Sequence, residues 1–574
     1  MISRPAQSNE NRPCPRRPGR FLVWGLAAGL LLGLAGWYFL AGSSDNGWSS
    51  KKNDREHFLR HRNARLKLLP PSPVPPQNAA SLNVIDAYLA AQWERERLPE
   101  GKSPLPLCDD TAFLRRVYLD LMGVTPSREV AENFLKNPAP DKREKLVDAL
   151  LARGRDYAAH WTAFWEDALA SGNSDYVGGM STHGTYRYWL QTSLAENKPY
   201  DLMVAELLDP TMPGNKNYGV TEETNRVSAF LRNRNPRETI QSAANVGQLF
   251  LGTGMKCAGC HNHFLNKEWP QKRFLAFAGL FGSGDLELVR CEEPSGKTVP
   301  SAFPFELPGA PRDVPKSIEE RLHRATLLLV DPANPRFART LVNRLWKRYF
   351  GLGLVEPVDD FRADRPASNP ALLDWLADDF MRHGYDLKHS IRLILTSRAY
   401  QLAYNPALED HFDVEHPGAP RYFRSPTLRR LTAEQFIDSL EFAGGKSHRR
   451  INRGDFAPAL AIALGRPASR QEVTTSRSDD LAVVQALELL NGSELHELIF
   501  SSALLEKIAS LPASETVPRV YWTVLSRAPS NSEQALGETF LAESENTPSG
   551  ISTREKIGDM LWALFVSPEF QYIR

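Results

Sequence analysis

Apolar residues recur at helical spacing along most of the chain after about residue 80. The segment DDTAFLRRVYLDLMG, residues 109–123, carries an apolar stripe with Asp110 before it and Gly123 after it. That spacing is typical of an amphipathic helix, and Asp and Gly commonly start and stop helices. DKREKLVDALLARG (141–154) and NPRETIQSAANVGQLFLG (235–252) have similar patterns. The pattern therefore predicts a mainly α-helical body.

The later half of the chain shows the same start and stop signals. NPRFARTLVNRLWKRYFG (334–351) and NPALLDWLADDFMRHG (369–384) both open with Asn-Pro and close with Gly. Two capping boxes are predicted before further apolar runs, Thr432 with Gln435 and Ser552 with Glu555.

One stretch breaks the helical pattern. DLELVRCEE, from Asp285 onward, alternates apolar and polar residues enough to predict a strand. Prolines at 294, 300, 304, 308, 311 and 315 exclude a helix after it. We place the boundary between two helical domains in this stretch.

The N-terminal pattern is different again. Residues 21–41, FLVWGLAAGLLLGLAGWYFLA, carry no charge, which predicts one transmembrane helix. Five arginines precede it with only Glu10 against them, which favours a cytoplasmic N-terminus and a body in the periplasm. The basic residues that follow within about 20 positions weaken this orientation signal, and cleavage after Ser43 is the alternative. Small residues at 25, 29 and 33 could let two such helices pair as a homodimer, although glycine is common in membrane helices.

The expected fold is mainly α, with two helical domains joined by a small strand-containing, proline-rich connection behind one N-terminal transmembrane helix. The expected segments are a cytoplasmic basic tail (1–20), the transmembrane helix (21–41), a proline-rich linker (42–79), a first helical domain (80–291), a second linker (292–316) and a C-terminal helical domain (317–574).

Overall composition narrows the classes of partner. The chain has 69 Lys and Arg against 68 Asp and Glu, which is the balance of an ordinary globular protein. No basic excess is present, so nucleic acid is not an expected partner.

The segment KCAGCHNHF, 256–264, carries the main candidate chemistry. Cys257, Cys260 and His261 form CxxCH, the signature in which two cysteines attach haem c covalently and the histidine ligates its iron. Haem c is attached outside the cytoplasmic membrane, which agrees with a periplasmic body. Cys257, Cys260 and His261 are therefore the expected cofactor residues.

The second iron ligand stays open at this point. The first methionine after the motif is Met381, in the other expected domain. The remaining candidates are His263 and residues upstream, namely His160, Met180, His183 and Met255.

Three other interpretations of the motif also stay open. His261 and His263 could bind a metal such as zinc together with the cysteines, although four ligands within seven residues rarely surround one ion. A CxxC dithiol could exchange disulfides, and a plain disulfide between Cys257 and Cys260 is the simplest alternative.

Paired carboxylates are a weaker candidate for chemistry. The aspartates that could pair in a catalytic cleft are Asp167, Asp359, Asp360, Asp378 and Asp379. Solvated helix faces and caps are the more common use of such residues. No nucleophile elbow, phosphate loop or HExxH motif is present.

The order of several segments resembles a known family. VGQLFLGTGMKCAGCHNHFLNKEWPQKRFLAFAGLF and FLRRVYLDLMGVTPSREV resemble the planctomycete cytochrome C-like domain, and NRLWKRYFGLGLVEPVDDFR and VYWTVLSRAPS resemble the planctomycete-specific C-terminal domain that usually follows it. Cys257, Cys260, His261 and His263 fall on the family's Cys-x-x-Cys-His-x-His pattern, and Trp165 and Asp167 fall on its Trp-x-Asp block. From residue 464 the chain lacks a cysteine that the C-terminal family pattern would have.

The resemblance implies a bacterial, extracytoplasmic protein but supplies no activity. We therefore expect a membrane-anchored periplasmic protein that binds c-type haem and has an electron-transfer or redox role with a partner protein. The alternative is a non-haem scaffold or metal-dependent enzyme acting on extracellular polymers, with zinc, calcium or no metal.

Overall fold

The structure is a computed structural model of the full chain. It describes residues 46–77, 83–99, 105–169, 176–177, 180–181, 183–212, 236–282, 284–290, 293–311, 313–443, 459–467, 473–477, 483–542 and 552–574. Two compact units are present, Met1–Glu56 and His57–Arg574. The apolar segment 21–41 lies outside the described residues, and none of the helices described is long and apolar enough to span a bilayer.

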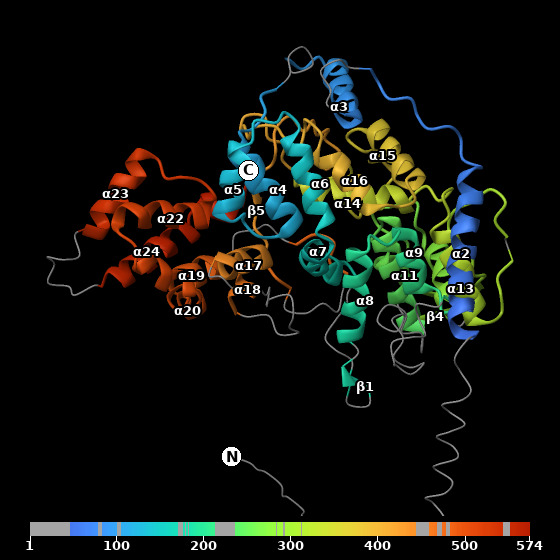
Figure 1. The fold of residues 1–574 in the computed structure, drawn as a ribbon. Coiled ribbons are helices and arrows are strands. Elements are labelled where there is room, and N and C mark those ends of the chain that lie inside the picture. Colours follow the sequence, from blue (N-terminus) through green and yellow to red (C-terminus); the bar gives the residue numbers. More distant parts are fainter. Residues whose placement is uncertain are drawn as a thin grey trace, which may run out of the picture. The chain divides into compact units, whose positions relative to one another are not determined.

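The described chain is mainly α-helical, as the sequence pattern predicts (Figure 1). The helices of the first half are α2 (Asn46–Leu66), α3 (Val84–Arg95), α4 (Asp110–Met122), α5 (Arg128–Lys136), α6 (Lys142–Ala152), α7 (Gly154–Ala168), α8 (His183–Ala195), α9 (Tyr200–Leu208), α11 (Pro236–Leu251), the 3-10 turn η4 (Lys256–Gly259), α12 (Gln271–Ala278) and the 3-10 turn η5 (Gly279–Phe281). Those of the second half are α13 (Ile318–Leu329), α14 (Phe337–Phe350), α15 (Pro370–Arg382), α16 (Leu387–Leu395), α17 (Ala433–Ala443), α18 (Ala459–Ala463), α19 (Val483–Asn491), α20 (Ser493–Phe500), α21 (Ala503–Ala509), α22 (Ala513–Leu525), α23 (Asn531–Ala542), α24 (Thr553–Phe565) and α25 (Pro568–Gln571).

Helix ends follow the local sequence signals closely. Helix α4 is capped by the side chain of Asp109, one residue before the predicted start, and ends at Gly123 in the left-handed conformation. Both predicted capping boxes form, since Thr432 and Gln435 bond each other's backbone N–H groups, as do Ser552 and Glu555.

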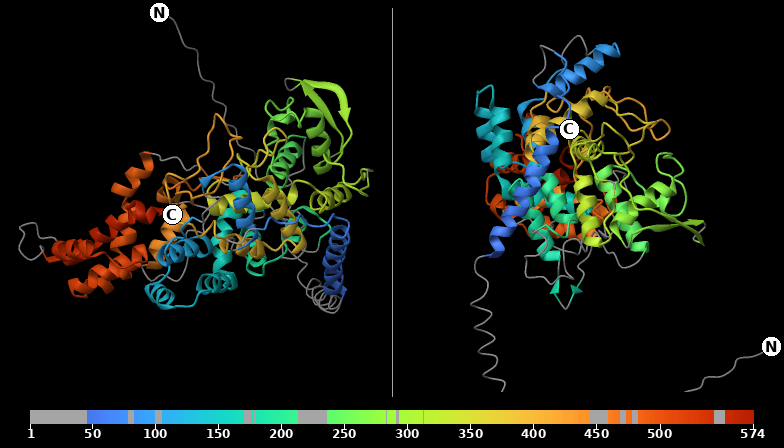
Figure 2. Two further views of the ribbon diagram at one scale, coloured as in Figure 1. Left: turned by 90° about the horizontal axis from the view of Figure 1, so that it is seen from above. Right: turned by 90° about the vertical axis from the view of Figure 1, so that its right-hand side faces the viewer.

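The predicted strand is β3 (Leu286–Arg290), which pairs antiparallel with β4 (Glu293–Val299). The hairpin is visible beside α12 in Figure 2. The sequence pattern did not predict β4, because Pro294 and a polar run hide it. A two-stranded hairpin tolerates proline because each strand has one edge without a partner. The other strands form two short antiparallel pairs, β1 (Tyr176–Val177) with β2 (Met180–Ser181) and β5 (Arg429–Arg430) with β6 (Tyr572–Ile573).

The expected linker 42–79 contains the helix α2. The residues of α2 are mostly polar, so the sequence has no apolar periodicity that would predict this helix. Phe58 is buried, and Arg65 pairs with Asp331 at 2.7 Å. Tertiary contacts of this kind stabilise a helix that the sequence pattern alone would not predict. The proline stretch 69–77 has no helix or strand after residue 69, as expected.

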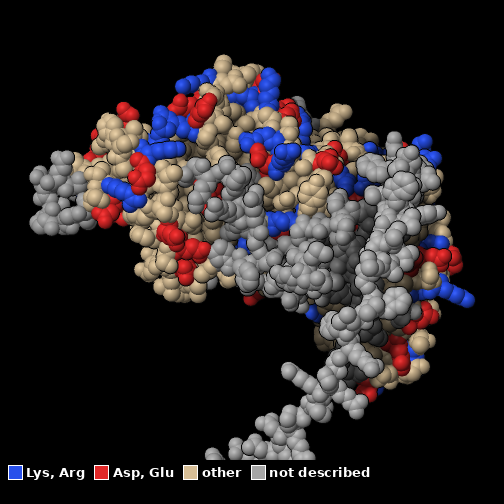
Figure 3. Space-filling view, turned by 60° about the horizontal axis from the view of Figure 1, so that its bottom comes forward, with Lys and Arg blue, Asp and Glu red and all other residues tan. Residues whose placement is uncertain are grey.

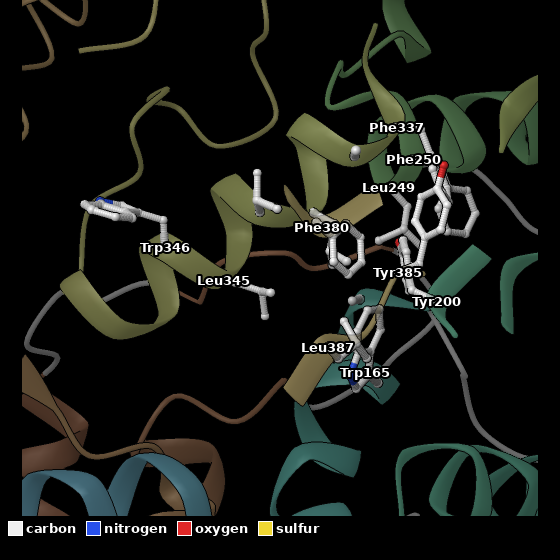
Figure 4. Packing of buried hydrophobic residues seen from close by; sticks show 14 of the residues in the cluster. Trp165, Tyr200, Leu249, Phe250, Phe337, Leu345, Trp346, Phe380, Tyr385 and Leu387 are labelled. Carbon is white, nitrogen blue, oxygen red and sulfur yellow. The ribbon is translucent and has the colours of Figure 1, made fainter. Parts of the chain in front are cut away.

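Aromatic side chains fill the centre of the core. Trp165 packs on Tyr200 with ring centroids 5.6 Å apart, and Tyr200 stacks on Phe337 at 5.3 Å (Figure 4). These residues come from α7, α9 and α14, so both expected helical domains contribute to one apolar cluster. A second cluster collects residues between Leu431 and Ile573, together with Leu119. The domain bounds themselves stay a prediction.

Candidate functional site

The CxxCH motif lies on a short surface turn rather than at the start of a new α-helix. Residues Lys256–Gly259 form the single 3-10 turn η4, in which the Cys260 N–H donates to the Cys257 carbonyl at 3.3 Å. The next helix, α12, begins only at Gln271. The motif therefore does not begin an α-helix. The Gly259 carbonyl at the end of the turn accepts instead from the side chain of Gln271, at 3.3 Å.

Burial alternates sharply within the motif. Ala258 and Gly259 are buried, and a Cβ at Gly259 would meet the Ile240 side chain at 2.9 Å. Cys257 and Cys260 are exposed and are free cysteines, so the alternative of a disulfide between them is not what the structure has. The turn therefore exposes both thiols to solvent, while the two small residues between them are packed against the protein interior.

His261 keeps one ring nitrogen free for a ligand. Its Nδ1 lies 2.7 Å from the backbone carbonyl oxygen of Asn262. A carbonyl only accepts, so Nδ1 carries the proton and the lone pair of the neutral ring lies on Nε2. The ring packs against Phe264, with centroids 4.3 Å apart. This tautomer, with the second nitrogen bonded to a carbonyl, is the usual one for a metal-ligating histidine.

His263 uses both ring nitrogens for backbone contacts. Its Nε2 lies 3.1 Å from the Gly254 carbonyl, and its Nδ1 accepts from the N–H of Asn266 at 2.9 Å and from that of Leu265 at 3.3 Å. The side chain thus closes the loop that carries the motif. A metal ion or iron at His263 would have to displace these hydrogen bonds.

Two of the upstream candidates for a second iron ligand face the interior. Met255 is 1% exposed, and its sulfur fills the space beside Gly247 of α11. His160 is buried on α7 with its Nε2 3.2 Å from Arg348. The side chains of Met180 and His183 lie outside the described residues. Met255 precedes the turn directly, but its side chain, like that of His160, is buried.

Apolar surface accompanies the motif. Phe264 is 80% exposed and Leu265 is 64% exposed, directly after His261 and His263. A haem group attached to Cys257 and Cys260 needs an axial imidazole and apolar contacts for its ring, and these residues are of the right kind. The donor set therefore fits a c-type haem.

Of the remaining cysteines, Cys108 alone lies within the described residues. Cys108 is buried and free, and its backbone N–H donates to Gln401 O at 2.9 Å. Cys14 and Cys291 lie outside the described residues.

A second candidate region is a cavity of about 150 Å³ that contains Asp167 of the Trp-x-Asp block. Trp165 is buried in the core two residues earlier, whereas Asp167 pairs with Arg477 at 2.6 Å. Arg477 also pairs with Glu434 at 2.6 Å, so its guanidinium bridges two carboxylates from distant segments. Burial is the largest single influence on the pKa of Arg477, and it lowers that pKa. The contacts with Glu434 and Asp167 together outweigh burial, so the pKa is raised.

The aspartates considered as catalytic pairs each have a basic partner. Asp359 pairs with Arg344, Asp360 with Arg365 and Asp378 with Arg382. In each of these pairs the aspartate is bound to an arginine, and an acid–base role for the aspartates stays a prediction.

Asp379 binds two histidines at the junction of α15 and α16. Its carboxylate lies 3.1 Å from His383 Nδ1 and 2.9 Å from His389 Nε2. The two rings stack at 3.7 Å with 17° between their planes, and one ligand atom from each of the three residues lies within 4.8 Å of the other two. The group is close enough to hold a metal ion, and hydrogen bonding between a carboxylate and two imidazoles accounts for the contacts without one. The spacing of Asp379 and His383, four apart on a helix, is a signal that the sequence reading missed.

The comparisons agree with the resemblance read from the sequence. Residues 84–285 match the family model PSCyt2, described as a protein of unknown function (DUF1549). Residues 321–461 match PSD1, likewise described as a protein of unknown function (DUF1553). The chain carries the planctomycete cytochrome-like domain followed by the C-terminal domain of unknown function. No curated protein and no solved structure matches it.

The cytochrome-like domain contains the whole CxxCH turn together with Trp165 and Asp167. The arginines of the cavity come largely from α14 and from the segments after it, and Arg344 and Arg348 belong to the C-terminal domain. The sequence reading missed them, although basic residues four apart on the apolar side of LVNRLWKRYF were the available signal.

Proposed function

We propose that the protein binds haem c covalently through Cys257 and Cys260, with His261 as an axial ligand, and that it has an electron-transfer or redox role. The observation that carries the proposal is the state of His261, whose Nδ1 is held by the Asn262 carbonyl at 2.7 Å while Nε2 keeps its lone pair. The two exposed free thiols on the same turn support it.

The attachment chemistry suits the exposed turn. Each cysteine S–H adds across one vinyl group of the haem, so a C–S bond and a C–H bond form and the vinyl double bond is lost. No oxidant is needed. Since both cysteines are reduced and exposed, the turn can meet the haem-attachment machinery without unfolding the core. Bound haem supplies one-electron redox chemistry.

Surface exposure favours electron transfer to a partner protein over chemistry in a closed pocket. His261 and Phe264 both lie on the surface, so a haem edge here would be open to contact. Lys and Arg are interspersed with Asp and Glu on the face shown in Figure 3, consistent with the near-zero net charge. A partner would therefore recognise local patches and not the charge of the whole protein.

The cellular setting is part of the same proposal. The apolar segment 21–41 anchors the protein in the inner membrane as a single span, and the body lies in the periplasm, where haem c is attached. Two copies could pair through the glycine ridge of this segment.

The experiment is an absorption spectrum of the full-length protein made with periplasmic haem-attachment machinery. The wild type should show a Soret band that shifts on reduction. The double variant Cys257→Ala, Cys260→Ala should lose the band. The His261→Ala variant should keep covalent haem with an altered spectrum, because the thioethers remain but the axial nitrogen is gone.

His416→Ala is the matched control, since His416 is an exposed histidine paired only with Asp413. Its spectrum should equal that of the wild type. A folded, colourless wild-type protein contradicts the haem proposal. In that case, zinc or calcium found by elemental analysis would support the non-haem alternative, a metal-binding scaffold or a metal-dependent enzyme acting on extracellular polymers.

A further inference from the structure

The cavity beside Asp167 has an unusual excess of positive charge. Its charged walls are six basic residues and two acidic ones, namely Arg344, Lys347, Arg348, Arg429, Arg430 and Arg477 with Asp167 and Glu434. The carboxylates that pair with Arg344, Lys347 and Arg429 are not among the residues that line the cavity. The charge that faces the cavity is therefore mainly positive.

Most of these cations have a carboxylate partner. Arg477 holds Asp167 and Glu434, Arg344 holds Asp359, Lys347 holds Glu356, and Arg429 holds Asp120 through two bonds of 2.8 Å. Asp120 also accepts from the Tyr400 hydroxyl at 2.7 Å. Its two oxygens are thus already occupied.

Arg348 differs, because no carboxylate in the described part of the chain pairs with it. Its Nη2 contacts only the neutral Nε2 of His160, at 3.2 Å, and its guanidinium lies over the Trp161 ring at 5.8 Å. Its Nε is buried without a hydrogen-bond partner. Burial is the main influence that lowers the pKa of Arg348. The neighbouring cations Arg429 and Arg477 lower it further, whereas Asp120 raises it. The partly buried guanidinium thus has no carboxylate partner among the described residues.

The His160 contact is fixed by the backbone. A Cβ at Gly123 would lie 2.2 Å from His160 Nδ1, so the imidazole occupies the place where any other residue would put a side chain. Gly123 itself has φ +70°, the conformation that ends α4. The chain therefore holds His160 against Arg348, and both residues line the cavity.

Size sets the class of ligand. A volume of about 150 Å³ corresponds to roughly ten water positions. This is room for a small oxyanion together with ordered water. Thr475 and Ser476 also line the space, where the Thr475 hydroxyl donates to Asp359 and the Ser476 hydroxyl donates to the Arg477 carbonyl.

We propose that this cavity is a binding site for a small oxyanion, a carboxylate, sulfate or phosphate group, held by the guanidinium of Arg348. The planar fork of arginine matches the oxygens of all three groups. The proposal is independent of haem, since the cavity residues and the CxxCH turn share no member.

The experiment is thermal unfolding of the full-length protein with sodium sulfate, phosphate or acetate, each titrated against sodium chloride at matched ionic strength. A bound anion raises the melting temperature with saturation, whereas general salt exclusion raises it without saturation. Which of the three anions saturates at the lowest concentration identifies the oxyanion. Equal, unsaturated curves for all of them overturn the proposal.

Arg348→Met is the decisive variant, with Arg382→Met as a control because Arg382 pairs with Asp378 on an exposed helix end. Arg348→Met should lose the saturable shift, and Arg382→Met should keep it. In chloride alone, Arg348→Met should be no less stable than the wild type, because it removes a cation without an ion pair. A large loss of stability in chloride, with the anion response unchanged in Arg348→Lys, would show that Arg348 is only structural.

Arg348→Lys keeps the positive charge but loses the planar fork of N–H donors. This variant replaces Arg348→Met in the test if Arg348→Met does not fold. Calorimetric titration should then give an affinity for the preferred anion at least about tenfold weaker than that of the wild type. Equal affinities in the two proteins would overturn the assignment.

Discussion

The CxxCH turn and the arginine cavity use charged and polar side chains in opposite ways. On the turn, Cys257, Cys260 and His261 are exposed, and His261 keeps a free nitrogen. Around the cavity, Arg429 and Arg477 are tied to buried carboxylates. Ligand atoms on the turn are available because solvent hydrates them, whereas the cavity groups are stable only with partners. The difference predicts where a substitution changes chemistry and where it changes stability.

The largest effect is expected from breaking the network. Arg429→Met leaves the fully buried Asp120 carboxylate without its two charged bonds. The free energy of unfolding should fall by about 3–5 kcal/mol. Urea denaturation measures it. Arg382→Met, at an exposed pair, should cost less than about 1 kcal/mol. Similar losses in both variants would contradict the claim that the buried ion pairs around the cavity stabilise the fold more than an exposed pair does.

An intermediate effect is expected within the motif itself. His263→Ala removes the acceptor of the Asn266 N–H and the contact to the Gly254 carbonyl, so unfolding free energy should fall by about 1 kcal/mol. His261→Ala should change it by no more than about 0.5 kcal/mol, because that side chain is exposed. Denaturation of the haem-free proteins compares them. A larger loss for His261→Ala than for His263→Ala would contradict the assignment of His261 as the ligand and His263 as the residue that closes the loop.

The smallest effect is a pH dependence at the Asp379 cluster. Hydrogen bonding to Asp379 raises the pKa of His389 above its usual value of 6.5. The folded state therefore holds this proton more tightly than the unfolded state. The contribution is complete below pH 6.5 and is lost as pH rises through the raised pKa. It should stay below about 1 kcal/mol because the groups are partly exposed.

Asp379→Asn removes the carboxylate charge and should flatten this part of the stability profile between pH 6 and 9. Melting temperatures of the two proteins across that range provide the measurement. A profile that keeps its slope in the variant would place the titrating group elsewhere.

Sequence patterns predicted the parts of this molecule that depend on near neighbours. The helices α4, α11 and α15 have their stop and start signals within a few residues, and the CxxCH motif needs only five positions. The polar helix α2 was missed because contacts such as Arg65 with Asp331 stabilise it from 266 positions away. The sequence around α2 does not indicate a partner so far along the chain.

The cavity could not be predicted for the same reason. Asp167, Arg348 and Arg477 lie on three segments far apart in the chain and meet only in the folded core. A basic residue on the apolar side of a helix signals a buried partner but does not say which one. Likewise, the different roles of His261 and His263 depend on where the backbone of one loop turns.

The most direct test of the central claim is the intact mass of the full-length protein after denaturation and reduction. Expressed with haem-attachment machinery, the wild type and His416→Ala should each carry the added mass of one haem, and the Cys257→Ala, Cys260→Ala variant should carry none. A folded wild-type protein with the bare mass of its chain would contradict covalent haem at this turn.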